Sequence, residues 1–211
     1  MSRRPKGVPS RRRPTRDLRE IILIVCEGAK TEPLYFNKLK SAFRLPSLNV
    51  HCEILGGSPG HSPKKIVEVA IQKKAKRCQN EIPYDQVYCV MDIEIPPRGL
   101  DDLIRLSDEN EIRLIFSNPC FEYWYLLHFT KSNRSFNTNR QLIAELKSHI
   151  PNYDKVSTVF LSEIYDLTNT AIQNAKELAS ANGWASIDLR DHNSSTRVHE
   201  VVEHLKNMST A

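Results

Sequence analysis

The sequence predicts an α/β protein in which helices flank a mostly parallel central sheet, followed by a mainly helical C-terminal part. Two apolar runs, at residues 21–26 and 87–91, show no polar alternation, which is typical of strands buried on both faces of a parallel sheet. Strand-like and helix-like segments alternate along the chain as far as about residue 137. We therefore expect a basic tail at 1–19, an α/β core at 20–137 and a helical part at 138–211 packed on the core.

The individual elements follow from local signals. Pro33 fits the first turn of a helix that opens at Thr31, and a Ser-Pro pair opens another at residue 63. Asn118 is a good helix N-cap and Pro119 a good first helical residue, so an aromatic helix is expected to begin there and cover 121–129. Further strands are expected at 48–55 and 112–116, and further helical patterns at 99–109, 139–149, 157–181 and 194–207.

Positive charge is concentrated in the N-terminal tail. Of 30 basic and 25 acidic residues, eight basic and one acidic lie in residues 1–19, which leaves 22 basic and 24 acidic residues in the rest of the chain. Because the tail has few apolar residues to bury, it is expected to be disordered when alone. Its arginines, among them Arg11, Arg12 and Arg13, are candidates for binding a nucleic-acid backbone, and a merely solubilising extension is the alternative.

Several classes of protein are excluded or disfavoured. The chain has no apolar run long enough to span a membrane and no apolar segment of signal-peptide type after its basic start, so we expect a cytoplasmic protein without membrane contact. The five cysteines contain no CxxC pair, and the seven histidines lack metal-binding spacing. A zinc site and a disulfide framework are therefore not expected.

Acidic residues follow both buried runs. Glu27 comes directly after the first run and precedes Gly28, while Asp92 and Glu94 follow the second. Ligands of open parallel sheets bind beyond the carboxyl ends of the strands, so the three carboxylates are expected to converge if the strands are neighbours. Oxygen donors without His or Cys are the ligand set of Mg²⁺ or Mn²⁺. For Glu27 alone, an acid favoured by a nearby helix N-terminus is the ordinary explanation.

Three further residues are candidates. Glu122 lies on an otherwise apolar segment, and a buried glutamate needs a partner or a metal, which favours a functional role. Lys30 could contact a phosphate or pair with Glu27 or Glu32. Thr196 lies where the last helix is expected to start, and such N–H groups bind phosphate, although a plain helix cap is the more ordinary reading.

Four segments together resemble one bacterial protein family. They are Val25–Pro33 with Tyr35-Phe36, Met91–Glu94, Ser117–Trp124 with Leu126–Phe129, and Ser195–His199. They resemble the RloB-like proteins, which are associated with abortive infection and built on a Toprim-like fold, and the resemblance spans about residues 20–205. The Asn-Pro-Cys-Phe-Glu segment is its most specific part.

The resemblance implies a Toprim-like core and a metal-dependent nuclease. Glu27 would bind the metal or act as general base, Asp92 and Glu94 would bind Mg²⁺ or Mn²⁺, and Glu122 would be an accessory acid. The implied substrate is RNA, tRNA included, or DNA, and an ATPase of the AAA/ABC-like class is an implied partner. Glu94 departs from the family pattern, which has aspartate there. The alternative is therefore a catalytically impaired module that binds nucleic acid or the ATPase.

Overall fold

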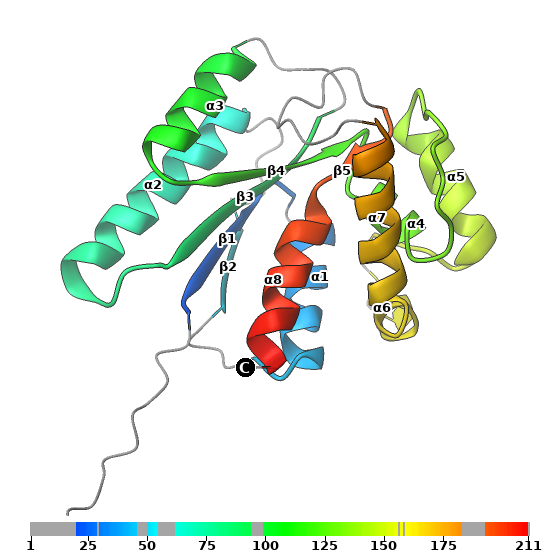
Figure 1. Ribbon diagram of the computed structural model, residues 1–211, viewed down its shortest axis with the longest axis horizontal. Coiled ribbons are helices and arrows are strands. Elements are labelled where there is room, and N and C mark those ends of the chain that lie inside the picture. Colours follow the sequence, from blue (N-terminus) through cyan, green and yellow to red (C-terminus); the bar gives the residue numbers. More distant parts are fainter. Residues whose placement is uncertain are drawn as a thin grey trace, which may run out of the picture.

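The structure is a computed structural model and describes residues 20–28, 30–45, 50–54, 62–93, 99–155, 157, 159–182 and 193–210. Within these residues it has the mixed α/β architecture that the sequence predicts (Figure 1). The strands are β1 (Ile22–Cys26), β2 (Val50–Ile54), β3 (Gln86–Asp92), β4 (Arg113–Asn118) and β5 (Ser195–Thr196). The helices are α1 (Thr31–Ala42), α2 (Pro63–Asn80), α3 (Leu100–Glu109), α4 (Glu122–Leu126), α5 (Asn139–His149), α6 (Val159–Tyr165), α7 (Thr168–Asn182) and α8 (Val198–Thr210).

The strands form one sheet in the order β2-β1-β3-β4-β5. Strands β1 to β4 are parallel, and β5 runs antiparallel to β4. Every residue of β1 is buried, as are the five central residues of β3. The two apolar runs are therefore buried strands of a mostly parallel sheet, as predicted, and they are neighbours, which the sequence had left open.

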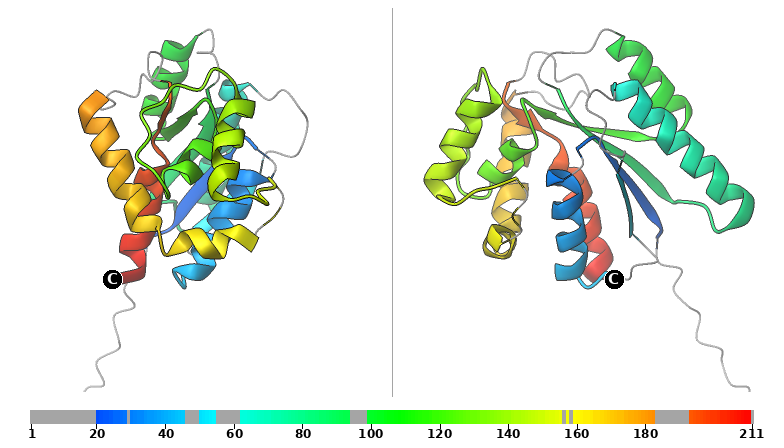
Figure 2. Two further views of the ribbon diagram at one scale, coloured as in Figure 1. Left: turned by 90° about the vertical axis from the view of Figure 1, so that its right-hand side faces the viewer. Right: turned by 180° about the vertical axis from the view of Figure 1, so that it is seen from behind.

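Helices cover both faces of the sheet. Helices α2 and α3 lie together on one face, whereas α1 and α8 lie on the other (Figures 1 and 2). This division follows from the strand order: α1 leads from β1 outward to β2, and α2 leads back across β1 to β3. The chain thus leaves β1 and β3 in opposite directions. The carboxyl ends of these two strands form the topological switch point, where open α/β sheets bind ligands.

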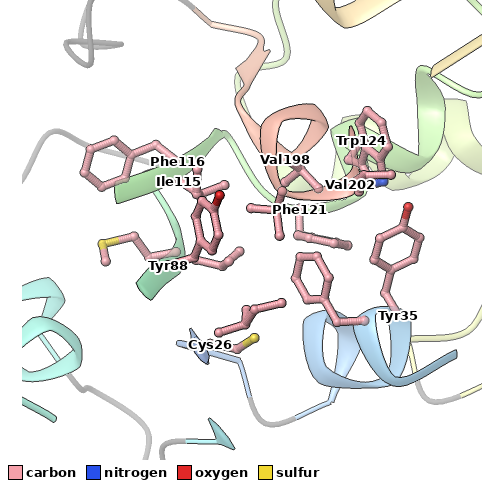
Figure 3. Packing of buried hydrophobic residues seen from close by; sticks show 14 of the residues in the cluster. Cys26, Tyr35, Tyr88, Ile115, Phe116, Phe121, Trp124, Val198 and Val202 are labelled. Carbon is pink, nitrogen blue, oxygen red and sulfur yellow. The ribbon is translucent and has the colours of Figure 1, made fainter. Parts of the chain in front are cut away.

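An aromatic cluster fixes α4 against α1. The ring of Tyr35 on α1 meets Phe121 edge to face with centroids 5.5 Å apart, and it meets Trp124 in the same manner at 6.5 Å. Figure 3 shows these three rings between the two helices. All three side chains are almost fully buried. Such pairs add about 0.5–1.5 kcal/mol each beyond their buried area, so the cluster holds the start of α4 near the start of α1.

The C-terminal part joins the sheet instead of forming helices alone. Ser195 and Thr196, which were expected to lie at the start of a helix, form β5 and pair with the end of β4. The Ser117 and Thr196 hydroxyl groups lie 2.8 Å apart, and the Arg197 N–H donates to the Phe116 carbonyl. Side-chain and backbone pairing with β4 therefore overrides the local helix signal, and α8 begins only at Val198.

Two further helical regions differ in detail from the sequence pattern. The helical pattern at 157–181 comprises two helices, α6 and α7, separated at residues 166–167. The aromatic helix begins at Glu122 instead of Pro119, because Asn118 is the last residue of β4 and pairs with Ser195. Tertiary strand pairing again competes successfully with the Asn-Pro helix signal.

The predictions about the N-terminal tail and the domain boundary stay predictions. The tail at 1–19 lies outside the described residues, and the boundary between the core and the C-terminal part at residue 137 stays a prediction. Within the part of the chain that is described, no helix is both long enough and apolar enough to cross a membrane.

Candidate functional site

Glu27 and Asp92 come together where β1 and β3 end. The Glu27 N–H donates to the Val90 carbonyl at 3.0 Å, which extends the β1–β3 ladder by one residue. The Glu27 carboxylate then reaches across the strands, and its Oε2 accepts a hydrogen bond from the Asp92 N–H at 3.1 Å. The predicted convergence of these two acids at one edge of the sheet is therefore present.

Glu32 adds a carboxylate that was not selected from the sequence. It lies in the first turn of α1, is buried, and accepts a hydrogen bond from the Gly28 N–H at 3.3 Å. A Cβ atom on Gly28 would lie only 2.1 Å from Glu32 Oε2, so the close approach of this carboxylate requires glycine at position 28. The signal was present in the Glu-Gly-Ala-Lys-Thr-Glu-Pro segment, but an acid before a helical proline has an ordinary explanation in the helix dipole.

Glu122 has the partners that a buried glutamate requires. Its side chain is almost fully buried, and Oε1 accepts a hydrogen bond from the Tyr153 hydroxyl at 3.0 Å. The Lys155 ammonium lies 2.9 Å from the same oxygen. Tyr153 and Lys155 lie between α5 and α6, about thirty residues farther along the chain, and the sequence analysis identified neither of them.

The clustering of these acids perturbs their protonation. Burial raises the pKa of Asp92 well above its usual range, and the carboxylates of Glu32, Glu122 and Glu27 raise it further, while Lys155 opposes them. Like charges disfavour the ionised form of one another in a poorly solvated site. A nearby cation would therefore bind at this edge with a favourable electrostatic interaction.

Glu32 and Glu122 shift in opposite directions. Burial raises the pKa of Glu32, and the charges of Glu122 and Glu27 add to this effect against its backbone hydrogen bonds. Burial also acts to raise the pKa of Glu122, but the Cys120 thiol and the Lys155 ammonium outweigh it, so the net shift is downward. Glu122 is thus held ionised beside carboxyl groups that resist ionisation.

A pocket of about 290 Å³ opens beside these acids. Acidic and basic groups from four parts of the chain line it together with one aromatic ring: Gly28, Lys30, Thr31, Glu32, Asp92, Phe121, Glu122 and Lys155. Lys30, the predicted phosphate contact, is exposed at its rim, directly before α1. The pocket therefore presents carboxylates and ammonium groups side by side.

The remaining predicted site residues lie elsewhere. Thr196 is fully buried in β5, where its hydroxyl contacts Ser117 and accepts a hydrogen bond from the Val198 N–H, and it does not line this pocket. Glu94, Arg11, Arg12 and Arg13 lie outside the described residues.

The donor set is suited to a hard divalent cation. Among the described residues, no three His, Cys, Asp or Glu side chains are placed to hold a metal ion together. Mg²⁺, however, is commonly bound through one or two carboxylates, with water and substrate phosphate completing its coordination. Glu27 and Asp92 offer such carboxylates, and burial together with the neighbouring acids raises the pKa of Asp92, an effect that a bound cation would oppose. The residues present therefore fit Mg²⁺ or Mn²⁺.

Comparison with known proteins gives one positive result. No curated protein matches the sequence. The family model described as "RloB-like protein" matches residues 22–205, which include both strand-end acids, Glu32, Glu122 and the two lysines of the pocket. The chain therefore belongs to the RloB-like family.

Proposed function

We propose that this protein is a Mg²⁺- or Mn²⁺-dependent nuclease with a Toprim-like core, which cleaves phosphodiester bonds of RNA or DNA in abortive-infection defence against phage. The observation that carries the proposal is the gathering of four carboxylates, from Glu27, Glu32, Asp92 and Glu122, at the switch point of a parallel sheet. Membership in the RloB-like family supports the same proposal, because the resemblance to this family implies a Toprim-like core and a metal-dependent nuclease.

Glu27 and Asp92 would hold the cation, joined by Glu94 if its side chain reaches the same edge. When bound, the ion would lower the pKa of a water molecule and neutralise charge that develops on the phosphate. The hydrogen bond from the Asp92 N–H to Glu27 fixes the orientation of the Glu27 carboxylate, so this ligand is positioned in advance. Gly28 fixes Glu32 in the same way.

The other pocket residues would act on the substrate. Lys30 lies at the rim and would contact a phosphate of the nucleic acid. Glu122 is kept ionised by its partners and would serve as an accessory acid that sets the charge of the pocket. The basic tail would hold the nucleic-acid backbone through counterion release. An AAA/ABC-like ATPase would control the enzyme, as the family resemblance implies.

A direct test uses purified protein and defined substrates. Wild-type protein, with and without a neighbouring ATPase, is incubated with tRNA, single-stranded RNA and DNA in the presence of Mg²⁺, Mn²⁺ or EDTA. We expect metal-dependent cleavage, reduced about 10²-fold or more in Glu27→Gln and Asp92→Asn because each removes one charged group from the site. Glu109→Gln, a matched change at an exposed acid on α3, should retain cleavage. Equal cleavage by all variants would contradict the assignment of the site.

The impaired-module alternative makes a different prediction. It is favoured by the glutamate at position 94 and by the lack of a ready three-ligand group among the described side chains. Under this alternative, calorimetric titration detects no Mg²⁺ or Mn²⁺ binding, while the protein still binds nucleic acid or the ATPase tightly. The nuclease proposal requires metal binding that Asp92→Asn weakens.

A further inference from the structure

Lys155 occupies an unusual place for a partner of a buried acid. Its ammonium lies 2.9 Å from Glu122 Oε1, yet 52% of its side chain is exposed, whereas the Glu122 side chain is only 2% exposed. The Glu122 carboxylate also accepts hydrogen bonds from the Tyr153 hydroxyl and the Cys120 thiol. The ion pair therefore joins a covered carboxylate to a lysine that faces the open pocket.

The lysine is directed at the same space as the acids. Lys155 lines the pocket together with Asp92 and Glu32, and its charge reaches Asp92 as well as Glu122. An ammonium group carries three N–H donors, and the contact with Glu122 uses one of them. Donors therefore remain for an anion that enters the pocket.

The charges around the pocket favour a basic group at the place where a phosphate would bind. Glu32, Asp92 and Glu122 line the pocket, and their ionised forms would repel a phosphodiester. Lys155 and Lys30 lie on the lining of the same pocket and oppose this repulsion.

We propose that Lys155 binds a non-bridging oxygen of the scissile phosphate and that Glu122 holds the lysine in position for this contact. The inference rests on the proposed nuclease function. It assigns a substrate-contacting role to Lys155 and a positioning role to Glu122. Lysine serves here as a point charge, which is a common way for proteins to bind phosphate.

The first test measures binding without turnover. A fluorescent single-stranded RNA of twelve nucleotides is titrated with protein in Ca²⁺ at several salt concentrations, and log Kd is plotted against log salt. Removing one phosphate contact lowers the slope by about 0.7 for a single strand. We expect this loss in Lys155→Met and the wild-type slope in Lys155→Arg. Should Lys155→Met not fold, Lys155→Gln takes its place.

Tyr153→Phe is the matched control. It removes a hydrogen bond from the same Glu122 oxygen at nearly the same distance, but Tyr153 does not line the pocket. The slope of Tyr153→Phe should equal the wild-type slope; an equal loss of slope in both variants would show that the slope reports the surroundings of Glu122 instead of a phosphate contact, and this result would overturn the proposal. An unchanged slope in Lys155→Met, or no binding of RNA by the wild-type protein, would also overturn it.

The second test separates this inference from the nuclease proposal. In Mn²⁺, kcat for cleavage should fall about 10²-fold in Lys155→Met, the scale for losing one group that stabilises developing charge. Active wild-type enzyme with an unaffected Lys155→Met variant refutes the role of Lys155 alone. A wild-type protein that binds RNA with the Lys155-dependent slope but never cleaves it refutes the nuclease proposal and leaves the phosphate contact in place.

Discussion

Substituting Gly28 by alanine tests the packing of the acidic site most directly. The new Cβ atom would lie 2.1 Å from Glu32 Oε2 and 2.6 Å from Oε1, distances that real contacts do not reach. The Glu32 carboxylate would have to move away and would lose the hydrogen bond from the Gly28 N–H. Because Glu32 is buried, we expect the free energy of unfolding to fall by about 1–3 kcal/mol.

The Glu32→Ala background reverses the sign of this effect. The backbone of Gly28 is not in the left-handed region, so alanine itself is tolerated there. Without the Glu32 side chain, Gly28→Ala should stabilise the protein by about 0.4–1 kcal/mol, because alanine restricts the unfolded chain. Glu32→Gln is the second control: it removes the charge but keeps the steric conflict, so Gly28→Ala should remain destabilising.

Urea unfolding of the four proteins in the Gly28–Glu32 double-mutant cycle measures the coupling between the two positions. A coupling free energy of about 1.4–4 kcal/mol is expected, because the stability lost in the presence of Glu32 and the stability gained in its absence both contribute to the difference. If Gly28→Ala has the same effect with and without the Glu32 side chain, the close contact that organises this side of the site is not formed in solution, and the reasoning fails.

Three other predictions concern burial and charge. His128 is buried, and burial lowers its pKa to about 4. As the pH drops from about 6.5 to 4, only the unfolded chain takes up a proton at this residue, so the free energy of unfolding should fall by up to about 3 kcal/mol. Urea unfolding across this range should show a shallower pH dependence of stability in His128→Gln than in the wild type. Tyr153→Phe removes a donor from buried Glu122, which should raise the pKa of Glu122 and destabilise the fold by about 1–3 kcal/mol in the same assay. Mn²⁺ at ten times its Kd should add about 1.4 kcal/mol to the stability, measured as a rise in Tm that Asp92→Asn abolishes and Glu109→Gln retains.

Each of these three has an outcome that contradicts it. An identical pH dependence in wild type and His128→Gln would show that His128 is not buried in its neutral form. Full stability of Tyr153→Phe would mean that Glu122 does not depend on this hydroxyl group. A Tm that is insensitive to Mn²⁺ would remove the main physical support for metal binding at the sheet edge.

The sheet centre and the strand-end acids could be predicted because their signals are local. The uninterrupted apolar runs before Glu27 and Asp92 identify buried parallel strands. Because parallel strands run in the same direction, their carboxyl ends lie at the same edge of the sheet. Glu122 was recognisable as an acid that needed a partner, since its neighbours are apolar and aromatic.

The partners of Glu122 could not be predicted, because their contacts are long-range. Tyr153 and Lys155 lie in an irregular segment between two helices, where no periodic pattern marks one residue as facing the site. Strand β5 escaped prediction for a related reason. Ser195 and Thr196 are typical helix-capping residues, and only the available edge of β4 makes them a strand.

The pairing of β5 with β4 also affects how readily an incomplete chain would aggregate. The hydrogen-bonded hydroxyl groups of Ser117 and Thr196 are separated by 79 positions in the sequence. Closing a loop of this size costs about 1.8 kcal/mol more than closing a ten-residue loop, so β5 has a clear entropic disadvantage in docking early. A chain truncated before residue 195 would leave the end of β4 as an open strand edge, available to pair with another molecule. The last segment thus protects the sheet from aggregation as well as completing it.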